Sequence, residues 1–246
     1  MSEERKTPKL SVLIPAFNEE ARIGKTLDQL NDYFAAVDYP VEVVVIDDGS
    51  IDRTANIVRE YNARSFPLRL VQNDQNMGKG YTVAHGMREA VGDFRLFFDA
   101  DGSTPIDQVE KFWPHFEDGA DVCIGSRALP ESDVQVHQPW YRETMGKIFN
   151  LFVRLLALRG FNDTQCGFKA FTAAAAMKIF PRQTLNGFGF DVELLYIANK
   201  HGLKTVEVPV VWINSPASRV HPVRDASRMF FELLIIRWRA LGGRYR

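Results

Sequence analysis

The sequence predicts an α/β protein whose mostly parallel, doubly wound sheet is flanked by helices, with amphipathic helices toward the C-terminus. In the first half, compact apolar runs alternate with amphipathic stretches, which is typical of parallel strands joined by helical crossovers. A polar segment rich in Asp, Asn or Gly follows each of the first four apolar runs. Because ligands bind beyond the carboxyl ends of strands in such sheets, these segments are where a functional site is expected.

The 246 residues, of which 46% are hydrophobic, suit one α/β domain or at most two small ones. The expected strands are residues 12–14, 41–46, 68–71, 94–98 and 122–124. The expected helices between them are residues 19–34, 53–61, 80–90 and 106–116. The less regular second half predicts a helix over 141–158, a turn at Gly167, a helix from Asp191 and a strand over 205–213. The simplest division is a tail over 1–9, a main domain over 10–218, and a basic loop with an amphipathic helix over 219–246.

Bulk composition excludes several classes of protein. A formal net charge of −1 argues against nucleic acid as a partner. Cys123 and Cys166 stand far apart, which indicates reduced thiols and neither a disulfide nor a zinc site. The first residues lack the apolar core of a secretory signal, and no run of about 20 uncharged apolar residues occurs. We therefore expect a cytoplasmic protein without a membrane-spanning helix.

Asp99 and Asp101 lie two positions apart at the end of an expected strand, so their side chains emerge on the same side. Neighbouring carboxylates repel each other unless a cation separates them. Hard oxygen ligands suit Mg²⁺ or Mn²⁺, which complete their coordination with water and substrate phosphates. The alternative is a strand-to-helix junction in which Asp101 or Ser103 only caps the next helix. The Asp-x-Asp pattern alone leaves both interpretations open.

Two further segments have the chemistry of a nucleotide site. Asp47 and Asp48 end the second strand, where a carboxylate can accept hydrogen bonds from a base or a ribose. Helix capping accounts for Asp52 but not for these two aspartates. Lys79 stands between two glycines at a helix start, where backbone N–H groups and the cation can meet an anion. A plain glycine-rich turn is an equal alternative for that segment.

Seven segments together point to one family. They are residues 14–19 (IPAFNE), 45–50 (VIDDGS), 76–80 (NMGKG), 99–101 (DAD), 125–127 (GSR), 163–169 (DTQCGFK) and 190–198 (FDVELLYIA). Their order and spacing resemble those of family 2 glycosyltransferases, which have the GT-A fold, and in particular the dolichyl-phosphate β-glucosyltransferases. The resemblance covers roughly residues 9–241 and implies that residues 10–218 form a GT-A glycosyltransferase domain.

The resemblance implies an inverting hexosyltransferase that moves a sugar, most simply glucose from UDP-glucose, to a polyprenyl phosphate and forms a β-glycosyl phosphate lipid. Mg²⁺ or Mn²⁺ would neutralise charge on the leaving diphosphate; Asp101 would hold the metal, and Asp99 either the metal or the donor ribose. Asp101 and Asp191 are the candidate catalytic residues, although Asp191 is equally well explained as a helix cap. The residues expected to bind the donor are Pro15, Ala16, Asn18, Glu19, Asp47, Asp48, Lys79, Asp99, Ala100, Asp101 and Arg219.

The implied acceptor is a phosphate, which is anionic at neutral pH and needs cations to hold it more than a base to activate it. The candidates are Arg127, Arg142 and Lys169, since arginine grips phosphate oxygens bidentately. A solvated helix face is an equal explanation for Arg142.

Two amphipathic stretches, residues 145–158 and 229–241, set apolar side chains between Lys and Arg. From residue 219 onward, seven arginines against Asp225 and Glu232 give a formal charge of +5. Both features fit helices that lie on the cytoplasmic face of a membrane, and the alternative is burial in the core or in a subunit interface. Other nucleotide sugars, a non-lipid acceptor, or a catalytically inactive nucleotide-sugar-binding protein are the competing interpretations of function.

Overall fold

The computed structural model of the protein describes residues 7–136, 139–158, 160–214 and 222–246, with the backbone alone for residues 140–143 and 222–226. The strands are β1 (Leu10–Ala16), β2 (Val41–Asp47), β3 (Leu68–Gln72), β4 (Phe94–Phe98), β5 (Val122–Ser126), β6 (Asp133–Val136), β7 (Phe168–Thr172), β8 (Thr205–Pro209) and β9 (Val211–Ile213). The helices are α1 (Ile23–Phe34), α2 (Thr54–Glu60), α3 (Lys79–Glu89), α4 (Trp113–Glu117), α5 (Trp140–Leu156), α6 (Ala173–Ile179), α7 (Phe190–Lys200) and α8 (Pro222–Leu241), with short 3₁₀ helices η1 (Ile106–Phe112) and η2 (Phe180–Arg182).

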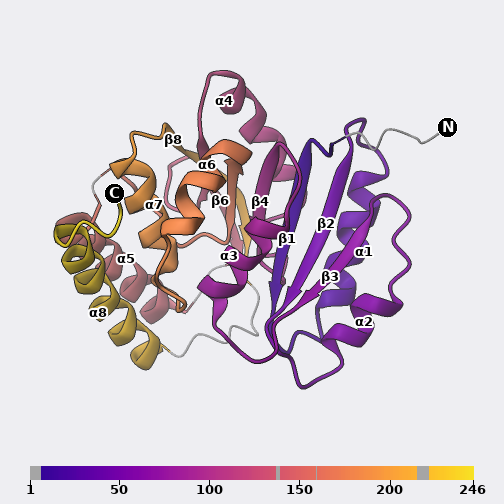
Figure 1. Ribbon diagram of the computed structural model, residues 1–246, viewed down its shortest axis with the longest axis horizontal. Helices are drawn as coiled ribbons and strands as arrows, with labels where there is room; N and C mark the ends of the chain where they lie inside the picture. Colours follow the sequence, from indigo (N-terminus) through magenta and orange to yellow (C-terminus); the bar gives the residue numbers. More distant parts are fainter. Residues whose placement is uncertain (1–6, 137–138, 159, 215–221) are drawn as a thin grey trace.

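Seven strands form the central sheet in the order β3-β2-β1-β4-β7-β5-β8, and β6 pairs with β9 in a separate ribbon (Figure 1). Strands β3, β2, β1 and β4 run parallel to one another. Strand β7 is antiparallel to both of its neighbours, β4 and β5. This inserted strand joins the two halves of the chain in one sheet.

Helices cover both faces of the sheet, which explains why its strands read as continuous apolar runs. Every residue of β2 is buried, and alternate side chains face opposite cores. Val43 and Val45 belong to the core beneath α1, α2, η1 and α4. Val44 and Ile46 belong to the core that includes α3, α6 and α7.

Helices α5 and α8 pack against each other at the end of the molecule remote from β3 (Figure 1). Phe149 and Val153 of α5 join the second core, as do Met229, Leu233 and Ile236 of α8. The opposite sides of both helices are exposed. Within the described part of the chain, no helix is long and apolar enough to cross a membrane.

The predicted fold class is confirmed, and all five predicted strands are present. The main differences lie from residue 106 onward. Strand β7 was not predicted. Residues 205–213 form two strands where one was expected, because residues 205–209 pair with β5 and residues 211–213 pair with β6. Residues 106–112 form a 3₁₀ helix ahead of α4 in place of the single helix expected over 106–116.

Candidate active site

The carboxyl ends of β2, β1 and β4 lie side by side, so the loops that follow these strands gather at one edge of the sheet. Pro15 and Ala16 end β1, Asp47 ends β2, and Ala100 lies in the loop after β4. This edge therefore brings together the predicted donor-site residues of the first half. Arg219 lies outside the described residues.

Asn18 and Glu19 connect the loops after β1 and β2. Asn18 has a left-handed backbone with φ 54°, which Asn tolerates better than most residues. Its N–H donates to Ser50 Oγ at 2.8 Å, and its Oδ1 accepts from the Ile51 N–H at 2.9 Å. The Glu19 carboxylate accepts from Arg22 at 2.5 and 2.7 Å. Both side chains thus shape the edge at which a nucleotide is expected.

Asp47 and Asp48 are both buried, and both accept hydrogen bonds from the chain itself. Asp47 Oδ2 accepts from Gln72 Nε2 at 3.0 Å. Asp48 accepts from Asn73 Nδ2 at 2.7 Å and from the backbone N–H groups of residues 77 and 78, each at 2.9 Å. Asp48 therefore fixes the loop that precedes Lys79.

Lys79 pairs with Asp99, with 2.7 Å between Nζ and Oδ1, and its Nζ lies 5.1 Å from the centre of the Phe97 ring. The glycine before it has φ 95°, and a Cβ there would lie 2.5 Å from the carbonyl oxygen of Asn186. Only glycine fits both the backbone and the space. The first turn of α3 is thus held against the loop before α7, with Lys79 directed at the end of β4.

The backbone of Gly167 lies directly against Asp99. The Asp99 N–H donates to the Gly167 carbonyl at 3.0 Å, and a Cβ on Gly167 would lie 1.8 Å from Asp99 Oδ2. Burial raises the pKa of Asp99; Lys79 opposes this rise, while the charges of Asp101 and Asp191 add to it. The Asp99 carboxylate is thus desolvated and lies within electrostatic reach of one lysine and two further carboxylates.

Asp101 is held less tightly than Asp99. Its Oδ1 accepts from the Ser103 N–H at 3.0 Å, its Oδ2 is 4.0 Å from Arg22 Nη1, and a quarter of its side chain (25%) is exposed. No group of three or more His, Cys, Asp or Glu in the described part of the chain is placed to hold a metal by itself. Two carboxylates fit Mg²⁺ or Mn²⁺ when water and ligand phosphates supply the other oxygens.

Lys169 and Asp191 form a buried ion pair. Lys169 is fully buried, and its Nζ donates to Asp191 Oδ1 at 2.6 Å and to the Cys166 carbonyl at 2.5 Å. Asp191 is the second residue of α7 and is only 4% exposed. Each group thus neutralises the other, and Lys169 has no exposed surface to offer an acceptor.

Arg127 follows β5 and forms a bidentate pair with Asp163. Its Nε and Nη2 donate to the two carboxylate oxygens at 2.6 and 2.9 Å, and its guanidinium carbon lies 5.3 Å from the centre of the Trp212 ring. Asp163 is buried, yet Arg127 lowers the pKa of Asp163 to about 2. Nη1 of Arg127 has no hydrogen-bond partner among the described residues and remains able to bind an anion.

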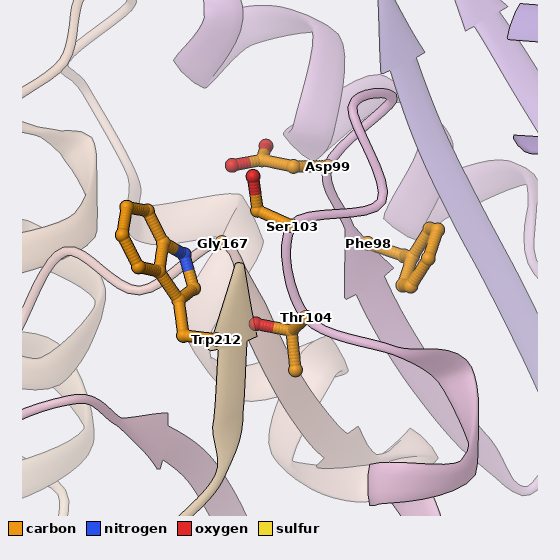
Figure 2. A pocket seen from close by; sticks show the side chains of 6 residues that line it. All are labelled: Phe98, Asp99, Ser103, Thr104, Gly167 and Trp212. Atoms are coloured by element: carbon orange, nitrogen blue, oxygen red, sulfur yellow. The ribbon is translucent and has the colours of Figure 1, made fainter. Parts of the chain in front are cut away.

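A small pocket lies beside Asp99 (Figure 2). It is lined by Phe98, Asp99, Ser103, Thr104, Gly167 and Trp212. Figure 2 shows the Ser103 hydroxyl pointing toward the Asp99 carboxylate, with the Trp212 ring on the opposite side of the pocket from Phe98. The pocket has room for about one water molecule, so it marks a polar gap beside Asp99 and does not define a ligand site by itself.

The structure brings the predicted residues Lys79, Asp99, Asp101 and Asp191 within electrostatic reach of one another. Arg142 lies in α5, but its side chain is outside the described residues. Sequence reasoning placed Gly167 in a turn and in one of the family segments, without a role of its own, and did not find Trp212. The short Cys166-Gly167-Phe168 segment signals close backbone approach, whereas no feature of the sequence singles out Trp212.

The mostly parallel sheet, with Asp99 and Asp101 beyond the end of β4, agrees with the GT-A fold that the resemblance implies. The profile of glycosyl transferase family 2 matches residues 11–180, and the chain belongs to this family. The predicted family, fold and class of enzyme are thereby confirmed. The roles of the individual site residues remain predictions.

Curated relatives match nearly the whole chain. A "Dolichyl-phosphate beta-glucosyltransferase" of Dictyostelium discoideum is 36% identical, covering 95% of this chain and 75% of that protein. A protein of the same name from Homo sapiens is 33% identical, covering 98% of this chain and 78% of that protein. Among solved structures, glucosyl-3-phosphoglycerate synthase from Mycobacterium tuberculosis, in complex with Mn²⁺, UDP-glucose and phosphoglyceric acid, matches with a TM-score of 0.69. It is 20% identical and covers 96% of this chain and 80% of its own, which shows the shared fold.

Proposed function

We propose that the enzyme transfers glucose from UDP-glucose to a polyprenyl phosphate of the dolichyl type, with inversion, and so forms a β-glucosyl phosphate lipid. The observation that carries this proposal is the similarity to dolichyl-phosphate β-glucosyltransferases over 95% or more of the chain. The Mn²⁺ and UDP-glucose in the structural neighbour support the donor and the metal. The carboxylates beside Lys79 are the oxygen ligands that such a metal needs, and the lysine can bind the donor diphosphate.

The donor would lie along the carboxyl edge of the sheet. Asn18 links the loops after β1 and β2 by hydrogen bonds, and these loops, together with the buried Asp47, would hold the nucleoside. The end of β4 would face the diphosphate. Asp99 and Asp101 would hold Mg²⁺ or Mn²⁺, which supplies charge neutralisation to the leaving diphosphate. Lys79 is positioned to stabilise the same developing charge, because it already lies 2.7 Å from Asp99.

The acceptor phosphate needs a cation, and the contacts favour Arg127 over Lys169. Arg127 keeps Nη1 available while Asp163 fixes its orientation, whereas Lys169 is buried against Asp191. Because Asp191 is bound to this lysine, we assign it a positioning role and no proton transfer. The anionic acceptor oxygen is itself a nucleophile, so the reaction needs no general base.

The same proposal places the enzyme on the cytoplasmic face of a membrane, bound through α5 and α8. Leu155 of α5 is 66% exposed, and Phe231 and Trp238 of α8 are 62% and 74% exposed. Exposed basic residues flank these side chains, at positions Lys147, Arg154, Arg228, Arg237 and Arg244. An anionic membrane would bury the apolar side chains among its lipids and attract the surrounding basic residues to its headgroups.

The direct test is incubation with radiolabelled UDP-glucose, a short polyprenyl phosphate and Mg²⁺ or Mn²⁺. We expect a lipid-extractable, acid-labile glucosyl product and its loss when EDTA is added. A panel of UDP- and GDP-sugars tests the donor. Donor binding without turnover under all conditions would instead indicate a nucleotide-sugar-binding protein.

The test of the acceptor site is Arg127→Lys, which keeps the charge but loses the bidentate pair with Asp163. We expect the acceptor KM to rise by about tenfold, with the UDP-glucose dissociation constant changed by less than about twofold. An equal loss of donor affinity would place Arg127 at the donor diphosphate.

A further inference from the structure

Glu232 is a buried acid on the inward side of α8, directly before the buried Leu233. Phe231 before it is 62% exposed, whereas Glu232 is 6% exposed. Its Oε2 accepts a hydrogen bond from the Gly189 N–H at 2.7 Å, and its Oε1 lies 3.4 Å from Arg228 Nε. Burial raises the pKa of Glu232, although the Gly189 N–H and Arg228 oppose this rise. A charged group desolvated in this way requires an explanation.

The two glycines at positions 187 and 189 make room for this carboxylate. A Cβ on Gly187 would lie 2.6 Å from Oε1 of Glu232, and a Cβ on Gly189 would lie 2.5 Å from Oε2. Neither glycine has a positive φ, so the backbone conformation does not require glycine at either position. Close approach of the Glu232 carboxylate is the physical reason for glycine here.

Glu232 also supplies a cap that α7 lacks. Gly189 is the N-cap residue of α7, and no side chain of that residue is available to accept from the first turn. The carboxylate of Glu232 satisfies the Gly189 N–H and places negative charge at the positive end of the helix. Helix α8 therefore fixes the start of α7 from the outside.

The segment that Glu232 holds reaches both lysine–aspartate pairs of the site. On one side, Asp191 lies two residues beyond Gly189 and binds Lys169 at 2.6 Å. On the other side, the Asn186 carbonyl accepts the Gly80 N–H at 2.8 Å. Gly80 follows Lys79, the partner of Asp99. Residues 185–189 thus touch the first turns of α3 and α7 together.

We propose that Glu232 is a positioning residue, which couples the seating of α8 to the geometry of the Lys79–Asp99 and Lys169–Asp191 pairs. The kinetic readout of this coupling rests on the proposed glucosyl transfer, whereas the coupling itself is a property of the fold. The other side of α8 carries the exposed Phe231 and Trp238. Binding of a membrane or another molecule to that side would therefore change the geometry of the two lysine–aspartate pairs through the Glu232 carboxylate.

The test compares Glu232→Ala, Glu232→Gln, Gly189→Ala and the double variant Glu232→Ala/Gly189→Ala in the full chain. Glu117→Ala, on the exposed surface of α4, is the matched control. We expect Glu232→Ala to lower kcat by about tenfold with the donor KM changed less than about twofold, and Glu232→Gln to recover most of kcat because the amide oxygen still accepts from Gly189. Gly189→Ala is expected to lower kcat as well, although Gly→Ala at an ordinary φ usually stabilises a protein.

The double variant removes the acid and the clash with its carboxylate oxygen, and leaves the closer approach of the two Cβ atoms at 2.8 Å. We therefore expect it to lose less than the two single losses combined. A kcat equal to that of the parent in Glu232→Ala would overturn the proposal. So would equal damage by Glu232→Gln and Glu232→Ala with a uniform fall in Tm, because that pattern indicates a purely structural contact.

Hydrogen exchange gives a readout that needs no substrate. In Glu232→Ala we expect faster amide exchange in peptides that cover residues 184–195 and 78–84, and unchanged exchange in α1 and α2. Faster exchange confined to α8, or spread over the whole chain, would overturn the coupling. If the parent enzyme made no glucosyl lipid, the proposed function would fail, while this measurement would still decide the role of Glu232.

Discussion

Asp99 and Asp101 occupy unequal positions although they are two residues apart. Asp99 is bound to Lys79 at 2.7 Å and lies against Gly167, whereas Asp101 accepts from the Ser103 N–H and lies 4.0 Å from Arg22; the two side chains are exposed to similar extents, 30% and 25%. We predict that Asp101→Ala lowers glucosyl transfer by about a hundredfold or more, since a metal ligand supplies several kcal/mol of charge stabilisation. Asp99→Ala should be less severe.

Initial rates at saturating Mg²⁺ or Mn²⁺ check this prediction, with Asp118→Ala on the exposed surface after α4 as the control. Near-parental, metal-dependent activity of Asp101→Ala would show that the metal lies elsewhere.

A variant of Lys169 can show whether this residue has a structural role, as half of a buried ion pair, or binds the acceptor phosphate. Removing it leaves Asp191 buried without its partner, so we predict that Lys169→Ala lowers the free energy of unfolding by about 3–5 kcal/mol. The double variant Lys169→Met/Asp191→Leu should recover much of this loss, because an apolar pair fills the same space. Urea unfolding of both variants measures the difference. Unchanged stability, with only the acceptor KM raised, would support the original prediction that Lys169 binds the acceptor phosphate.

The positions of single residues could be predicted where they follow from the parallel arrangement of the strands alone. Asp47 ends β2, and Asp99 and Asp101 follow β4. These two strands run parallel on either side of β1, so the polar segments after the predicted strands are expected at one edge of the sheet. The partner of Lys169 was not predictable. It depends on the antiparallel insertion of β7, which turns this lysine inward toward the start of α7.

At the scale of elements, the Arg127–Asp163 pair ties the end of β5 to the loop before β7. Asp163 has a folded pKa of about 2, below its ordinary value of 3.8, so the folded state favours the carboxylate. The stabilisation is present above pH 4 and is lost as the pH falls through about 2. We predict a contribution on the order of 2 kcal/mol at neutral pH.

Chemical unfolding of the parent and of Asp163→Asn between pH 7 and pH 2 measures this contribution. The gap in stability between the two proteins should close as the pH falls. A gap independent of pH over this range would mean that the pair contributes through shape alone.

The strands differed in how readily the sequence revealed them. Strands β1, β2 and β4 are apolar runs covered on both faces, and such runs are visible without knowledge of their neighbours. Strand β7 has five residues directly after a glycine and includes a buried lysine, which breaks the apolar pattern. The break between β8 and β9 depends on pairing with β6, a contact with a distant segment that local periodicity does not encode.

At the scale of the whole molecule, α5 and α8 give one end an apolar, basic surface opposite the end that carries β3 (Figure 1). We predict that the protein sediments with liposomes in proportion to their anionic lipid content, and less so at high salt. Replacing Phe231 and Trp238 with Ser should weaken binding by about tenfold or more, since each removes apolar area from the lipid contact.

Met177→Ser is the matched control, because Met177 is 61% exposed on α6, away from this surface. A protein that stays in the supernatant with every lipid mixture would assign the apolar side of α5 and α8 to another contact, such as a second copy of the chain.

The antiparallel insertion of β7 also governs how the chain folds as it leaves the ribosome. Strand β4 pairs with β1 on one side, and its other edge stays unpaired until β7 is added. Until Thr172 has been synthesised, the growing sheet ends in an unpaired apolar strand with Phe94, Leu96 and Phe98. At about 5–20 residues per second this interval lasts several seconds, during which an open strand edge invites association with other chains. Translation pauses before β7 has left the ribosome would therefore favour aggregation of the nascent chain, whereas pauses after β7 has emerged and paired would find that edge closed.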